Sequence, residues 1–257
     1  MTSADLAVER KPGPGPGPGE RRTFRGALQE LAEVQKPGAG FPAYTRWVNR
    51  RLARVPAAAA FRVGLTPNAV TAASAASSAA GIALLITLPP SAVLGVSVAI
   101  LLALGYVLDS ADGQLARLTG SGSRAGEWLD HVVDAMRMPA IHLAVLVGLN
   151  HWLPEQTWAQ AAALLFCIVA AGQFMSQVLA EQLSGRVHRA PAGRGGVLQS
   201  VVNLPTDTGL LCWLFLLWGA PLAFAVVYTA LLVLNAGHAL ISMRRKHQHL
   251  ERLGNAA

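Results

Sequence analysis

Four aspartates with helical spacing are the residues of this sequence best placed to do chemistry. Asp109 and Asp112 are three residues apart and Asp130 and Asp134 are four apart, so each pair would share one face of a helix. All four lie in or beside apolar stretches, where a lone acid at the bilayer centre costs about 2.5–3.5 kcal/mol. Carboxylate oxygens suit Mg²⁺ or Mn²⁺. We therefore predict a divalent-cation site, with Arg117 beside it for a phosphate group.

The spacing also predicts that the two pairs meet. Asp109 stands eight residues before Arg117 and Asp134 eight residues after Gly126, and eight helical residues rise about 12 Å. If residues 118–125 close a helical hairpin, both pairs reach the same depth and the four carboxylates face one another. The alternative is a pair of solvated structural acids at a turn. Four acids at these spacings, with Gly113 and Arg117 beside them, favour the functional interpretation.

The composition indicates the elements that must position these acids. Of 257 residues, 53% are hydrophobic and 14% charged, whereas soluble domains carry about 25% charged residues. The formal net charge of +7, with this apolar content, favours an anionic membrane surface over nucleic acid as the partner. Cys167 and Cys212 lie inside apolar runs, which argues against a disulfide scaffold or a cysteine zinc site.

Six apolar stretches are long enough to cross a bilayer, which takes about 20 residues each. They lie near 67–88, 92–117, 126–149, 158–183, 198–218 and 221–243. We therefore expect an all-α integral membrane bundle of six transmembrane helices. Residues 41–246 would form the membrane domain, between a disordered Pro-Gly tail at 1–40, with a short helix near 26–35, and a cytoplasmic tail at 247–257.

An amphipathic segment precedes the first span. Residues 43–55 carry apolar side chains at helical spacing and arginines on much of the remaining surface. This pattern predicts an interfacial helix lying on the bilayer, and the alternative is a surface helix docked on protein. Lysine and arginine are absent near 89–91, 150–157 and 219–220 and present in the alternate loops. The positive-inside rule then places both termini and the acidic site on the cytoplasmic side of the cell membrane.

The acids belong to a longer pattern. From Asp109 to Asp134 the sequence reads Asp-x2-Asp-Gly-x2-Ala-Arg-x8-Gly-x3-Asp-x3-Asp, and residues 64–68 read Gly-Leu-Thr-Pro-Asn. This pattern resembles the signature of the CDP-alcohol phosphotransferase family at every fixed position. With the six spans, the resemblance covers about residues 43–243.

The resemblance implies a reaction and its participants. Family members transfer a substituted phosphate group from a CDP-linked donor, usually CDP-diacylglycerol, to an alcohol with release of CMP. They require divalent metal, here two Mg²⁺ or Mn²⁺ ions, and a homodimer among membrane lipids is expected. By analogy, Asp109, Asp112 and Asp130 would bind metal, while Asp134 would act as general base and also touch metal. The CDP site would be lined by Gly113, Ala116, Arg117, Gly126 and Asn68.

The acceptor alcohol is less clearly marked. Glycerol 3-phosphate or inositol phosphate fits the basic loops, and inositol, serine and other alcohols stay open. Relatives that use inositol phosphate usually carry an arginine directly after the last Asp, where this chain has Ala135. Arg137 could neutralise a carboxylate or hold an anionic acceptor. Asp207, with Asn203, could face the acceptor or pair with a loop arginine. The loop arginines fit either membrane topology or a phosphorylated acceptor, and they are Arg186, Arg189 and Arg194.

A rival class is a small transporter or cation channel that uses the acids as an ion site. A conduction path needs polar residues at several depths, whereas the outer halves of these spans are almost wholly apolar. Arg117 beside the acids also favours a phosphate-handling enzyme.

Overall fold

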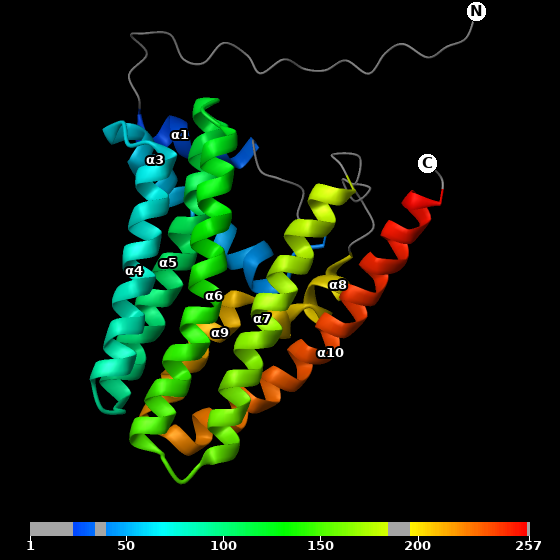
Figure 1. Ribbon diagram of the computed structural model, residues 1–257. Coiled ribbons are helices and arrows are strands. Elements are labelled where there is room, and N and C mark those ends of the chain that lie inside the picture. Colours follow the sequence, from blue (N-terminus) through cyan, green and yellow to red (C-terminus); the bar gives the residue numbers. More distant parts are fainter. Residues whose placement is uncertain (1–22, 34–39, 185–195, 256–257) are drawn as a thin grey trace, which may run out of the picture.

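The computed structural model describes residues 23–33, 40–184 and 196–255, and these residues contain helices and no strand. Five helices are long and apolar enough to cross a membrane: α4 (Pro67–Thr87), α5 (Ala92–Thr119), α6 (Arg124–Trp152), α7 (Thr157–Leu183) and α10 (Pro221–Gly254). The predicted all-α membrane bundle is confirmed. The described N-terminal helices and the last turns of α10 lie at the same end of the bundle (Figure 1).

Local capping explains where the helices near the site begin and end. The Thr66 side chain accepts a hydrogen bond from the Ala69 amide at 3.2 Å, and Pro67 occupies the first helical position of α4. Ser123 caps α6 in the same way through the Gly126 amide. Gly120 ends α5 with a φ of 63°, a left-handed conformation that glycine adopts without steric cost. These caps define the α5–α6 turn predicted at 118–125.

The fifth predicted span is not one continuous helix. It consists of α8 (Val197–Val202), the 3₁₀ turn η3 (Leu204–Thr206), α9 (Thr208–Leu214) and the 3₁₀ turn η4 (Phe215–Gly219). Pro205 lacks an amide hydrogen and clashes with a preceding helical carbonyl, so it interrupts a helix. Asp207 then starts the next helix, because its side chain accepts a hydrogen bond from the Gly209 amide at 3.1 Å. This break brings Thr206, Asp207 and Thr208 to a cavity wall.

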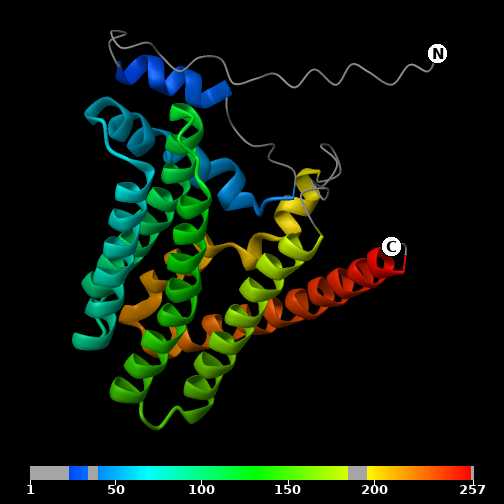
Figure 2. The same cartoon turned by 45° about the horizontal axis from the view of Figure 1, so that its top comes forward.

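The N-terminal segment is more ordered than a tail. The short helix predicted near 26–35 within this region is observed as α1 (Phe24–Glu33). A helical segment follows over residues 43–63, containing the π-helix η1 (Thr45–Asn49), α2 (Arg50–Leu52) and α3 (Arg54–Val63), and it runs across one end of the bundle (Figure 2). The rest of the Pro-Gly tail lies outside the described residues.

One face of this juxtamembrane segment docks on protein while another stays open. Ala53 and Ala57 are buried in a cluster with residues of α1 and α5. Leu52 and Val55, by contrast, are about half exposed, at 50% and 53%. The docked-helix interpretation therefore holds for the buried face. The interfacial interpretation stays a prediction, since an exposed apolar face is what an interfacial helix presents to lipid.

The main core lies in the bundle half away from the motif turn. Phe215, Trp218, Phe224 and Tyr228 are fully buried there, and the Phe224 ring contacts the other three, stacked on Tyr228 and edge-on to Trp218. Helix α10 continues past the predicted end at 243 to Gly254, so most of the predicted C-terminal tail is helix. Helices α5 and α6 each pack along α4, and α4 therefore sets the relative positions of the two motif helices.

Candidate functional site

Three of the four predicted acids meet. Asp109 of α5 and Asp130 and Asp134 of α6 each offer a carboxylate oxygen, and these oxygens all lie within 4.8 Å of one another. The two helices present the acids at matching depth, as the spacing around the turn predicts. We call this set the acidic cluster.

Asp112 is held separately. Its residue is 5% exposed, and its Oδ2 accepts a hydrogen bond of 2.5 Å from the Thr71 hydroxyl of α4. Thr71 also lies 3.1 Å from the Pro67 carbonyl oxygen, one turn earlier in α4. Sequence reasoning missed Thr71, since nothing in its local pattern separates it from the other small residues of α4.

Arg137 joins three helices at the level of the acidic cluster. Its Nη1 lies 2.9 Å from Asp109 Oδ1 and 3.2 Å from Asp134 Oδ1. Its Nη2 donates to the Ser74 hydroxyl at 2.7 Å, and that hydroxyl lies 2.8 Å from the Gly105 carbonyl oxygen. Of the two roles left open by the sequence, neutralising carboxylates is the one seen. Ser74 was missed.

The residues present fit a divalent metal. The acidic cluster offers only hard oxygen donors at short mutual distances, the kind of ligand that Mg²⁺ and Mn²⁺ prefer. With Asp112 nearby, four carboxylates are offset by the ion-paired guanidinium of Arg137, the one such pairing with these acids in the described part of the chain. The excess negative charge in a partly buried position is what bound cations would compensate.

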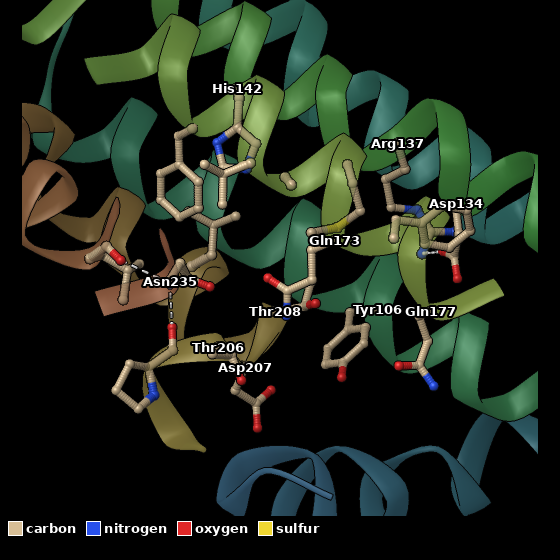
Figure 3. Close-up of a pocket in the computed structure, with 18 of the residues that line it drawn as sticks. Tyr106, Asp134, Arg137, His142, Gln173, Gln177, Thr206, Asp207, Thr208 and Asn235 are labelled. Carbon is tan, nitrogen blue, oxygen red and sulfur yellow. Dashed lines mark hydrogen bonds and ion pairs between the residues drawn. The ribbon is translucent and has the colours of Figure 1, made fainter. Parts of the chain in front are cut away.

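A cavity of about 260 Å³ opens beside the acidic cluster (Figure 3). Asp109, Asp134 and Arg137 line it, facing Tyr106 of α5 and Asp207 at the break in the fifth span. Side chains of α7 and α10 complete the wall, among them Gln173, Gln177 and Asn235. A small polar molecule in this cavity would lie against the acids, which suits an acceptor alcohol.

Asp207 is built into the cavity wall. It is 2% exposed; the Thr45 amide donates to Oδ2 at 2.8 Å and the Thr45 hydroxyl to Oδ1 at 2.9 Å. Thr45 Oγ1 also lies 2.6 Å from the Tyr106 hydroxyl. Asp207 thus ties the juxtamembrane segment to the broken span. The loop arginines proposed as its partners, Arg186, Arg189 and Arg194, lie outside the described residues, and Asn203 bonds to Gln199 and Gly40 instead.

The residues expected to line a CDP site lie at the motif turn. A Cβ placed on Gly126 would be 3.3 Å from Asn68 Oδ1, so the starts of α4 and α6 approach closely there. A Cβ on Gly113 would be 3.5 Å from Arg117 Nη1. The Arg117 side chain therefore lies back along α5 toward Gly113, and Ala116 precedes it on the same helix.

A second, larger cavity of about 1270 Å³ lies between α6, α7 and α10. Its basic side chains include Arg124, Arg245 and Lys246, and it reaches the position after the last motif Asp, Ala135. Phe174 and Gln177 of α7 line both this cavity and the one at the acidic cluster. The sequence analysis explained the basic residues at the end of α10 by membrane topology alone. Their place in a cavity wall could not be predicted, because the residues of one helix do not show which helices pack beside it.

Comparison with known families decides the classification. The sequence model of the CDP-alcohol phosphatidyltransferase family matches residues 64–240. The chain belongs to this family. The match contains the whole motif from Asp109 to Asp134 and all six predicted spans up to residue 240 of α10. It leaves out the juxtamembrane segment, whose Thr45 nonetheless contacts Asp207.

Two relatives of this CDP-alcohol phosphatidyltransferase family member carry informative names. The chain is 31% identical over 157 residues to a phosphatidylinositol phosphate synthase of Mycolicibacterium smegmatis, covering 60% of this chain and 65% of that protein. It is 28% identical over 161 residues to an archaetidylinositol phosphate synthase of Aeropyrum pernix, covering 62% of this chain and 80% of that protein. The match to the mycobacterial protein thus spans slightly less than two thirds of it.

Proposed function

We propose that this protein is a metal-dependent phosphatidyltransferase that moves a phosphatidyl group from CDP-diacylglycerol to a phosphorylated polyol. The observation that carries the proposal is the acidic cluster, which the family motif supplies with carboxylate oxygens within 4.8 Å of one another beside a cavity. An ion-conducting role explains neither the nucleotide-transferase motif nor the arginine beside it. The family assignment over residues 64–240 favours the enzyme further.

The proposed reaction exchanges one phosphate ester for another. The acceptor oxygen forms a bond to the lipid-side phosphorus of the donor, and the bond from that phosphorus to the CMP oxygen breaks. The hydroxyl proton passes to Asp134, which lines the cavity where the acceptor would lie. Arg137 holds Asp134 and Asp109 toward each other through its Nη1 contacts of 3.2 Å and 2.9 Å.

The metal ligands are proposed as Asp109, Asp112, Asp130 and Asp134, with two Mg²⁺ or Mn²⁺ ions. Bound there, the ions would neutralise the diphosphate and stabilise the departing CMP. Thr71 orients Asp112 through its hydroxyl. The CDP part of the donor is assigned to the motif turn, where Gly126 leaves room beside Asn68 and Arg117 lies along Gly113.

The acceptor is proposed to be an inositol phosphate. Both relatives named above are synthases of inositol phosphate lipids. This chain lacks the arginine after the last motif Asp, but Ala135 at that position lines the larger cavity together with Arg245 and Lys246. These two side chains can supply the missing positive charge. The acceptor phosphate would then lie in the larger cavity and its hydroxyl beside Asp134.

The orientation in the membrane is proposed from the distribution of basic residues, and the assembly from the family. Both termini and the site would face the cytoplasm, where CDP-linked and phosphorylated substrates occur in water and the lipid tails stay in hydrocarbon. A homodimer is the proposed assembly, by analogy with the family.

The test follows CMP release by purified protein in mixed micelles containing CDP-diacylglycerol and Mg²⁺ or Mn²⁺. The acceptors are inositol 1-phosphate, glycerol 3-phosphate, inositol and serine. We expect release with inositol 1-phosphate and its loss in Asp134→Asn. Release with a different acceptor would replace inositol phosphate as the proposed acceptor. No release with any acceptor, together with no binding of labelled donor, would refute the proposed transferase activity.

A further inference from the structure

Three arginines from two parts of the chain gather near the C-terminal end of α5. Arg50 and Arg54 stand one turn apart in the juxtamembrane segment, and Arg117 lies in the last turn of α5. The Gln114 side chain, one turn before Arg117, donates to the Arg50 carbonyl oxygen at 2.9 Å. We call Arg50, Arg54 and Arg117 the arginine cluster.

Tight packing holds the arginine cluster together. Ala53 and Ala57 of the juxtamembrane segment and Ala111 and Leu115 of α5 are all fully buried in one apolar cluster. Small side chains let two helices approach closely. The arginines therefore come from backbones that are packed against each other, which keeps their side chains near one another.

In the arginine cluster, the positive charges of Arg54 and Arg117 have no ion-paired carboxylate among the described residues. Burial, followed by the neighbouring charges of Arg117 and Arg54, lowers the pKa of the Arg50 guanidinium below its ordinary value. The Nε atoms of Arg54 and Arg117 are buried without a hydrogen-bond partner among the described residues. Within the same part of the chain, no carboxylate lies within 4.0 Å of either guanidinium, although Asp112 attracts Arg117 electrostatically.

Such an arrangement is costly unless an anion binds it. Like charges repel strongly when partly withdrawn from water, and an unmet buried donor adds its desolvation penalty. Guanidinium groups match phosphate oxygens in geometry and bind them in bidentate fashion. Arg117 also lies beside Gly113 in the motif, so a phosphate held here would be next to the proposed CDP site.

We propose that Arg50 and Arg54 extend the donor site beyond the family motif, forming with Arg117 a phosphate-binding cluster for the diphosphate of the CDP-linked donor. This inference rests on the proposed function, and it adds two residues that lie outside the matched range of 64–240. It also gives the juxtamembrane segment a part in binding substrate, in addition to contact with the bilayer.

The experiment compares Arg54→Gln and Arg50→Gln with the matched control Arg51→Gln, whose side chain is exposed on the same helical segment. Full-length protein in neutral-detergent micelles is assayed for the KM of CDP-diacylglycerol and of the acceptor. Binding of CDP is measured separately by equilibrium dialysis. We expect about a tenfold or larger rise in the donor KM and in the CDP dissociation constant for each variant, as for loss of a charged hydrogen bond. The acceptor KM and the Arg51→Gln values should stay unchanged.

The outcomes separate this inference from the proposed function. If wild type releases CMP and Arg54→Gln and Arg50→Gln match Arg51→Gln, the arginine cluster has no donor role. An effect confined to vesicles with anionic lipid would assign the cluster to bilayer phosphate and overturn the donor assignment. If wild type releases no CMP, the proposed function fails, and CDP binding by equilibrium dialysis then tests the arginine cluster by itself. Arg54→Lys guards against misfolding, since it keeps the charge and should retain part of the affinity.

Discussion

Replacing Arg137 with glutamine tests whether one guanidinium holds the site together. The change removes two contacts to carboxylates, at 2.9 Å and 3.2 Å, and one to the Ser74 hydroxyl at 2.7 Å. The Arg137 side chain is only 5% exposed, and those of Asp109 and Asp134 are 16% and 28% exposed. Solvent therefore screens these contacts weakly, and the two acids lose their common counter-charge.

The expected loss in the free energy of unfolding follows from the two carboxylates that the substitution leaves without a counter-charge. Breaking a buried ion pair by removing one partner costs about 3–5 kcal/mol, because the other charge stays buried and uncompensated. We expect the upper half of that range without metal, since one guanidinium serves two carboxylates. Saturating Mg²⁺ or Mn²⁺ should recover part of the loss, because a cation at the acidic cluster supplies positive charge to the same oxygens.

The assay is thermal unfolding of the purified protein in detergent, with chelator and then with increasing Mg²⁺ or Mn²⁺. We expect Arg137→Gln to unfold at a clearly lower temperature in chelator and to gain more stability from metal than wild type does. Arg62→Gln, an exposed change in α3, is the control and should behave like wild type. An Arg137→Gln protein as stable as wild type in chelator would refute the view that this guanidinium compensates the acids. If metal raised the unfolding temperature of both proteins equally, the view that the metal compensates the same carboxylates as Arg137 would be wrong.

Further predictions test other contacts of the site. Thr71→Val should lower the rate of CMP release about tenfold or more, because Asp112 loses its 2.5 Å hydrogen bond, whereas Thr71→Ser should retain activity. Gly209→Ala should destabilise the protein by about 1–3 kcal/mol in thermal unfolding, since the new methyl group overlaps the Tyr44 ring. An unchanged unfolding midpoint would show that the Tyr44 ring can move aside without cost. Replacing Arg245 and the adjacent lysine with glutamine should raise the KM of inositol 1-phosphate about tenfold and leave that of unphosphorylated inositol unchanged, and equal effects on both would disprove phosphate recognition there.

The break in the fifth span shows where an apolar pattern is an incomplete guide. Residues 198–218 are apolar enough to suggest one helix, yet Pro205 and the Asp207 cap divide it into short pieces. Both signals are local and were present in the sequence. Hydropathy describes how well a stretch tolerates lipid, whereas backbone hydrogen bonding decides whether its helix continues. The break matters because it places Asp207 against Thr45 and the cavity.

The acidic cluster was predictable because its cause is local. Helical periodicity places Asp130 and Asp134 on one face, and the short turn capped by Gly120 and Ser123 brings Asp109 to their level. The bilayer adds a strong constraint, since buried acids need a function or a partner. Residue type, spacing and hydropathy therefore sufficed to predict the membrane bundle and the main candidate residues, and the resemblance of the motif to a known signature pointed to the family.

The partners of those acids were decided only by tertiary packing. Thr71 and Ser74 lie on α4 among many small residues, and only the packing of α4 against both motif helices turns their hydroxyls toward Asp112 and Arg137. Likewise, Arg50 comes near enough to Arg117 to feel its charge because apolar faces distant in the sequence dock together. Contacts between helices depend on rotation and approach distance, which no single segment encodes. The sequence by itself determined which groups could do the chemistry, and the fold decided which side chains hold, neutralise and complete them.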